Sequence, residues 1–263
     1  MDRAMVIAVL LVGCEACVRE GVPPPEPPSV PSSGEGIGPG SSGSGGGAAS
    51  GASRVEASPS APSALVTRAE LEAMDARECH AFVRERGGRF EVIPEADARG
   101  VIAPIRLSGP LGGVTIEHGG RSRMHEIMSC KLTVSLLGWA PALRAAGFDR
   151  IEHASIYRPG ARVRSTGRQS GHAGGGAIDA FHFIRPDGTR LEVERDWADK
   201  TIGAPVCPPR QGEPEAQHVL RTLVCDAVAA DLFQVVVTPH GDRHHHNHVH
   251  LEVRPDVDWT HVR

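Results

Sequence analysis

The sequence predicts an α+β domain, with a mostly antiparallel sheet flanked by about three helices. Stretches with helical spacing of apolar residues and stretches typical of strands occur in mixed order rather than in strict alternation. Glycine and proline turn signals separate several short strand-like runs. The N-terminal quarter is too rich in Pro, Gly and Ser to pack, so we expect the domain at residues 66–256, followed by a C-terminal tail at 257–263.

Residues 1–13 are typical of a signal peptide. The apolar run from Ala4 to Gly13 has ten residues, and a membrane-spanning helix needs about 20. The run ends in Leu11-Val12-Gly13-Cys14, which resembles the lipobox of bacterial lipoproteins and marks Cys14 for lipidation. An ordinary signal peptide cleaved elsewhere is the alternative. With either kind of signal peptide, we expect the protein to be exported from the cytoplasm. The lipobox predicts a lipoprotein of the cell envelope, facing the periplasm or the exterior, with the lipid as its only membrane contact.

Residues 14–65 are expected to form a tether without a fold of its own. The segment 22–28 is proline-rich, and the segment 34–51 is nearly all Gly, Ser and Ala. Neither composition supplies enough apolar surface to offset the entropy of ordering the chain.

Three helices are expected in the domain, at residues 67–86, 124–146 and 214–231. Thr67 and Glu70 have capping-box spacing, and two glycines end the first helix. The second helix contains Pro141, which should kink or divide it. The third helix begins at Pro214 and carries one clean apolar face.

Strands are expected where β-branched and apolar residues alternate or cluster between turn signals. They lie at residues 101–107, 113–117, 150–157, 177–184, 190–193, 233–238 and 248–253. The sequence Pro186-Asp187-Gly188 predicts a hairpin turn. The last two strands should pair with each other antiparallel.

The cysteines and the charge limit the possible partners. The net charge of −4 and the absence of a basic stripe argue against nucleic acid as a partner. Four cysteines of the domain fit two disulfides in an exported protein, and four cysteines allow three pairings. We expect Cys79–Cys130 and Cys207–Cys225, the nearest in sequence, to pair because these pairings agree with the helix layout. We expect a monomer.

Two histidine-containing stretches predict a metal site. The glycine-rich loop 170–179 carries His172 and Asp179, and its small residues allow close backbone approach. His248 and His250 alternate along the last strand and therefore face one side of the sheet. Two imidazoles and a carboxylate are a zinc ligand set that leaves a fourth position open. The run 244–246 alone is typical of a surface histidine cluster.

The pattern Ser170-x-His172-x-x-Gly175-x-Ala177-x-Asp179 resembles the motif of zinc D-Ala-D-Ala peptidases. The ending His245-x-x-His248-x-His250 resembles that of the related murein endopeptidases. Most closely, residues 70–254 resemble the extensin-like C-terminal domain family of bacteria. The shared features are Cys79, Cys130, Tyr157, Arg158, the motif at 170–179, Arg195-Asp196-Trp197, Cys225 and the His-rich end.

The resemblance implies a D-Ala-D-Ala peptidase-like fold of the hedgehog type, with zinc bound by His172, Asp179 and His250. It implies hydrolysis of peptidoglycan stem peptides by a zinc-activated water, as a D,D-carboxypeptidase or an endopeptidase. The carboxypeptidases carry a catalytic Glu just before their last His, whereas this chain has Asn247 three residues before His250. A non-catalytic zinc module that binds wall peptides or an envelope protein is therefore the alternative.

His248 is the natural replacement for the missing Glu as general base, with His245 as a second proton carrier. Tyr157 and Arg158 resemble the Tyr-Arg pair of the carboxypeptidases, so Arg158 is expected to bind a substrate carboxylate. A surface arginine in a turn is the other interpretation of Arg158. Ser170 completes the predicted substrate-binding set, as a hydroxyl that braces the loop rather than as a nucleophile.

Overall fold

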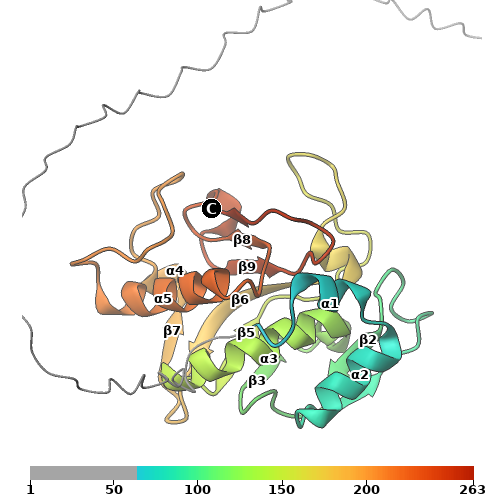
Figure 1. Cartoon of the computed structure of the whole chain (residues 1–263). Coiled ribbons are helices and arrows are strands. Elements are labelled where there is room, and N and C mark those ends of the chain that lie inside the picture. The colour runs from blue at the N-terminus through green and yellow to red at the C-terminus, as the bar shows by residue number, and fades with distance from the viewer. Residues whose placement is uncertain (1–63) are drawn as a thin grey trace, which may run out of the picture. The chain divides into compact units, whose positions relative to one another are not determined.

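Two β-sheets and the helices packed against them make up residues 64–263, the part of the chain that the computed structural model describes (Figure 1). The architecture confirms the predicted α+β class. The expected signal peptide, Cys14 and the tether up to residue 63 lie outside the described residues. Within the described part, no helix is both long and apolar enough to cross a bilayer.

The larger sheet has the strand order β10-β8-β9-β6-β5-β3, with β7 also paired to β6. Its pairs are antiparallel except β3–β5 and β10–β8. The expected antiparallel pairing of the last two predicted strands is confirmed as β8–β9. Its strands are β3 (Thr115–His118), β5 (Arg150–His153), β6 (Ala177–Ile184), β7 (Arg190–Glu192), β8 (Val235–Val237), β9 (Val249–Glu252) and β10 (His261–Val262). Because β10 pairs with β8, the segment predicted as a tail after residue 256 extends this sheet.

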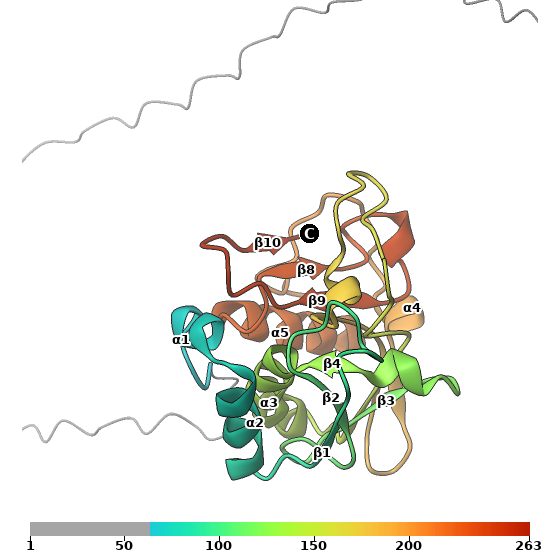
Figure 2. The ribbon, with the colours of Figure 1, turned by 90° about the vertical axis from the view of Figure 1, so that its right-hand side faces the viewer.

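The smaller sheet is antiparallel and lies beside α2 and α3 (Figure 2). It consists of β1 (Phe90–Val92), β2 (Pro104–Leu107) and β4 (Met128–Ser129). The helices are α1 (Arg68–Ala73), α2 (Ala76–Glu85), α3 (Cys130–Ala145), α4 (Val193–Asp196) and α5 (Glu215–Ala229).

Two of the predicted helices differ from those observed. The helix expected over 67–86 is two helices, because the Asp75 side chain accepts from the Glu78 amide and begins a second capping box. The helix expected from residue 124 begins at Cys130, where the Ser129 side chain caps it. The residues before it form the 3₁₀ helix η1 (Arg123–Glu126) and β4. Helix α3 runs through Pro141 without dividing.

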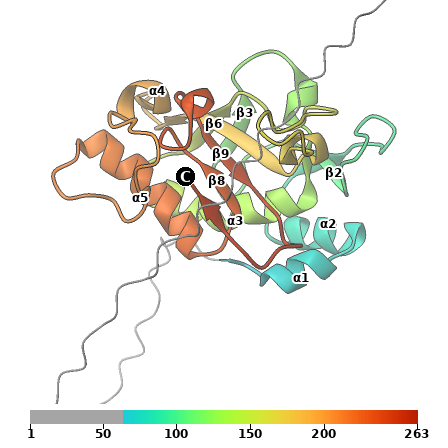
Figure 3. The same cartoon turned by 90° about the horizontal axis from the view of Figure 1, so that it is seen from above.

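The main core lies between the larger sheet and helices α3 and α5, which lie on the same side of β6, β8 and β9 (Figure 3). The Trp139 indole of α3 donates to the Leu223 carbonyl of α5 at 3.0 Å and packs edge-on against Phe183 of β6. A bulge in the β5–β6 pairing lets Ala180 and Phe183, three residues apart, both join this core. Asp179 lies between the core residues Ile178 and Ala180 and therefore points to the opposite face of the sheet.

Both predicted disulfides are confirmed. Cys79–Cys130 joins α2 to the start of α3, and Cys207–Cys225 joins the loop after α4 to α5. Each bridge therefore fixes a helix of the core to a segment distant in sequence.

Loss of the first disulfide should destabilise the protein more than loss of the second. The pairs are 51 and 18 residues apart. Loop-closure entropy therefore predicts that replacing both cysteines by serine costs about 4 kcal/mol for the first pair and about 3 kcal/mol for the second. Urea unfolding of the two double variants measures this difference. The opposite ranking would show that strain or residual structure outweighs chain entropy.

Candidate metal centre

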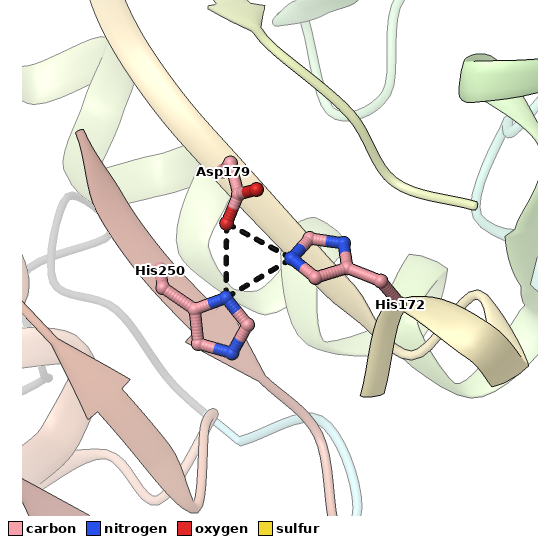
Figure 4. Close-up of side chains that lie close together, drawn as sticks. All are labelled: His172, Asp179 and His250. Carbon is pink, nitrogen blue, oxygen red and sulfur yellow. Dashed lines mark hydrogen bonds and ion pairs between the residues drawn. The ribbon is translucent and has the colours of Figure 1, made fainter. Parts of the chain in front are cut away.

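Three buried side chains meet beside the larger sheet (Figure 4). They lie on the face opposite the residues that pack against α3 and α5. They are His172 of the 3₁₀ helix η2 (Gly171–Gly174), Asp179 of β6 and His250 of β9. The Asp179 Oδ1 atom lies 2.9 Å from His172 Nε2 and 2.9 Å from His250 Nδ1, and the two nitrogens are 3.1 Å apart. The expected grouping of these residues is confirmed.

Strand pairing places Asp179 and His250 opposite each other. They are direct partners in the antiparallel β6–β9 register. Along β9, Val249 and Leu251 enter the core, so His250 and Glu252 share the other face. This confirms the alternation predicted for the last strand.

The glycine-rich loop places the third ligand candidate. The Ser170 side chain accepts from the His172 amide and begins η2, and Gly175 ends it in the left-handed region with φ of 61°. A Cβ at Gly175 would also lie only 3.1 Å from the Ser129 amide nitrogen. Position 175 therefore requires glycine for two reasons: the left-handed backbone conformation disfavours other residues, and a side chain would have no room.

The hydrogen bonds around the two imidazoles leave one lone pair of each pointing inward. His172 Nδ1 donates to the Ile156 carbonyl at 2.8 Å, so its Nε2 carries no proton in the neutral ring. His250 Nε2 donates to the Glu252 carboxylate at 3.2 Å, so Nδ1 is the free atom when the ring is neutral. In the neutral rings, two nitrogen lone pairs and a carboxylate oxygen thus converge, and either a proton on His250 Nδ1 or a metal ion between the three atoms satisfies them. The residues fit a metal ion such as zinc.

The second oxygen of Asp179 is held by other groups. Asp179 Oδ2 accepts from the Ser155 hydroxyl at 3.2 Å and lies 3.6 Å from Arg158 Nη2. Burial by itself raises the pKa of Asp179, but its contacts with the imidazoles of His172 and His250 outweigh burial and hold the pKa well below the usual range. Burial lowers the pKa of His172. An ionised carboxylate and a neutral imidazole are the protonation states that bind metal.

Metal binding should become tighter as pH rises towards 9. Burial lowers the pKa of His250, but bonds to Asp179 and Glu252 outweigh it and raise the pKa to about 9. Below that pH, a proton on His250 competes with a metal ion. We expect the metal affinity to fall about tenfold for each unit by which the pH is lowered below 9. Metal binding in this range should release about one proton. Calorimetry in buffers of different ionisation enthalpy measures the release; affinity independent of pH between 6 and 8 would contradict the expectation.

His248 lies beside the three residues with its Nε2 atom towards them. His248 Nε2 is 3.5 Å from Asp179 Oδ1. Its Nδ1 donates to the Asn247 side-chain oxygen at 2.8 Å, so Nε2 is free to accept a proton. Burial lowers the pKa of His248 to about 4, and the ring is neutral at pH 7. Asn247 therefore fixes the ring form that a general base requires.

His245 completes a chain of rings that leads away from the centre. It ends the 3₁₀ helix η3 (Arg243–His245), and its ring lies 5.0 Å from that of His248 and 6.0 Å from that of His250. Its Nδ1 donates to Asp242 at 2.9 Å. His244 is exposed, and half-exposed His246 lies 3.6 Å from Glu194, so these two behave as the predicted surface histidines.

The predicted substrate-binding residues occupy different environments. Tyr157 is 2% exposed and its hydroxyl donates to the Arg99 carbonyl at 3.0 Å, which supports a packing role instead. Ser170 caps η2, as expected of a bracing hydroxyl. The Arg158 side chain is 47% exposed while touching Asp179, so substrate contact stays a prediction for this residue.

The sequence interpretation missed two residues that touch the ligand candidates, Ser155 and Glu252. Glu252 continues the two-residue alternation of His248 and His250, and this signal was present in the sequence. Ser155 lies beyond the end of β5, and no local pattern marks its contact with Asp179.

The fold and the centre define an α+β domain with a buried candidate metal site of two histidines and one aspartate. The family model described as extensin-like protein C-terminus matches residues 77–263, which is more than half of the chain. The chain therefore belongs to this family, as the sequence resemblance indicated. No curated protein and no solved structure matches the chain.

Proposed function

We propose that the protein is a zinc-dependent peptidase that hydrolyses peptidoglycan stem peptides in the cell envelope. One observation carries the proposal: three lone-pair atoms converge within 3.1 Å, and the free Nε2 of His248 lies beside them. A structural zinc site uses four protein ligands, whereas a catalytic site uses three and keeps one position open. The described residues offer three such ligands, from His172, Asp179 and His250.

A zinc ion held by these residues would supply two effects: it would lower the pKa of a water ligand to about 7, and it would polarise a carbonyl oxygen. The protein supplies the proton transfers. His248 accepts the proton of the attacking water at Nε2, with Asn247 holding the opposite nitrogen. His245, oriented by Asp242, is the next proton carrier.

Arg158 is the proposed contact for a substrate carboxylate. Its half-exposed guanidinium touches Asp179 through Nη2 at 3.6 Å, which places the group at the edge of the centre. A planar guanidinium can bind a carboxylate through two parallel hydrogen bonds. A peptide that ends in a free carboxylate would thus be oriented towards His248.

A non-catalytic zinc module is the second candidate. The pKa of about 4 that burial gives His248 makes it a weak base, and the neighbouring residue is Asn247 rather than an acid. Such a module would bind wall peptides or an envelope protein through the same face without hydrolysis.

Incubation of the full-length protein with zinc and muropeptides, followed by mass spectrometry, separates these functions. Loss of a terminal D-Ala identifies a carboxypeptidase, and a cut cross-link identifies an endopeptidase. Tight peptide binding without a product supports the module, and neither binding nor product contradicts both candidates. A chelator-treated sample is the control, since zinc should restore its activity.

We also propose that Cys14 is lipidated and anchors the protein to the membrane. The support is the lipobox-like sequence before it and the short apolar run. Fractionation of cells that express wild type or Cys14→Ser tests this proposal. Release of only the variant into the soluble fraction is the expected result.

A further inference from the structure

The geometry points to Glu252 as a positioning residue that sets the metal-binding atom of His250 and joins the two chain segments that carry the histidine ligands. Gly171 provides the space in which its carboxylate sits. This inference rests on the metal-binding part of the proposed function and is independent of peptide hydrolysis.

The first support is the contact between Glu252 and His250. The Glu252 side chain is 8% exposed, and its Oε2 accepts from His250 Nε2 at 3.2 Å. A buried carboxylate is costly unless it is hydrogen-bonded or paired, so this contact is a fixed feature of the site. With Nε2 committed to Glu252, His250 presents Nδ1 towards Asp179.

The second support is that the same oxygen reaches the other ligand-bearing segment. Glu252 Oε2 also accepts from the Gly171 amide at 3.3 Å, one residue before His172. Its other oxygen lies 3.6 Å from Arg254 Nη1. One carboxylate thus links β9, which carries His250, to η2, which carries His172.

The third support is the absence of a side chain at position 171. A Cβ there would lie 2.4 Å from Glu252 Cδ and 2.7 Å from Oε2, closer than atoms tolerate. The φ of Gly171 is outside the left-handed region, so space rather than backbone conformation requires the glycine. Any larger residue should displace the carboxylate from both of its contacts.

The consequence is a predicted effect on metal affinity. Carboxylates that orient metal-binding histidines typically contribute 10–100-fold in affinity. Glu252→Ala should therefore weaken binding by about 10–100-fold. Glu252→Gln should restore most of it, because its side-chain oxygen can accept the same two hydrogen bonds.

The test is a Co²⁺ titration of the full-length protein by visible absorption, with a competing chelator to give the affinity. Gly171→Ala should weaken binding as Glu252→Ala does and alter the cobalt spectrum in the same way. Gly176→Ala is the matched control, because its Cβ would meet nothing closer than 3.6 Å, and it should bind as wild type. Glu152→Ala, which removes a carboxylate 2.7 Å from His182 on the same sheet, is the second control.

The double variant Gly171→Ala/Glu252→Ala tests whether the two substitutions weaken metal binding through the same contact. If Gly171 acts by seating Glu252, the double variant should bind no more weakly than Glu252→Ala alone. Wild-type affinity in both folded Glu252→Ala and Gly171→Ala would overturn the inference. If Glu252→Ala does not fold, Gly171→Ala decides the question alone. A wild-type protein that binds no cobalt would instead contradict the proposed metal site.

Discussion

His248→Ala is expected to keep nearly stoichiometric zinc and to lose about 10²–10⁴-fold in the rate of peptide hydrolysis, the contribution of general acid–base catalysis. The His248 Nε2 atom lies 3.5 Å from Asp179 Oδ1, but His248 is not one of the three residues whose ligand atoms all lie within reach of a single ion, which are His172, Asp179 and His250. Its removal should therefore leave metal binding intact. Elemental analysis of the purified variant, together with rates on muropeptides, measures both effects.

His218→Ala is the matched control for this variant. His218 is exposed and pairs with Glu213 away from the centre, so its loss should change neither zinc content nor rate. If His248→Ala comes out without zinc, His248 is a ligand rather than the base. If it keeps zinc and full activity, another residue accepts the proton.

Replacing any one of the three ligand residues by alanine should release zinc and reduce hydrolysis at least as much as His248→Ala does. The reason is that each ligand atom lies within 3.1 Å of the other two, and two ligands alone hold zinc weakly. A ligand that binds only the folded state stabilises it by about 4 kcal/mol at 1,000 times its Kd. His172→Ala, Asp179→Ala and His250→Ala should each lose this zinc-dependent stabilisation.

Thermal unfolding with and without excess zinc measures this loss. Asp187→Ala, in the exposed hairpin turn after β6, is the control and should keep the wild-type rise in Tm. A rise in Tm that persists in Asp179→Ala would place the zinc elsewhere, such as on the surface histidines His244 and His246.

The positions of the three candidate metal ligands follow local rules in part, while the choice of His250 over His248 came from the resemblance to zinc peptidases. Alternation along a strand puts His250 opposite the core residues Val249 and Leu251, and the structure has this arrangement. Antiparallel pairing then brings Asp179 directly across from His250. The disulfides were predicted as the pairings nearest in sequence that agree with the helix layout, and the structure has both.

The remaining contacts depend on tertiary structure that no local pattern encodes. The parallel pairing of β10 with β8 joins residues 261–262 to 235–236, and nothing near either segment indicates it. The contact of Ser155 with Asp179 depends on how the chain leaves β5. The break between α1 and α2 is different, because the capping pair Asp75 and Glu78 was present in the sequence and was overlooked.

Anomalous diffraction at the zinc edge, from crystals of the zinc-loaded protein, tests the central claim most directly. We expect one strong peak at about 2.0–2.2 Å from His172 Nε2, Asp179 Oδ1 and His250 Nδ1. His248 Nε2 should lie beyond coordination distance of the peak. No peak among these three atoms, or zinc only on the histidines of residues 244–246, would contradict the account.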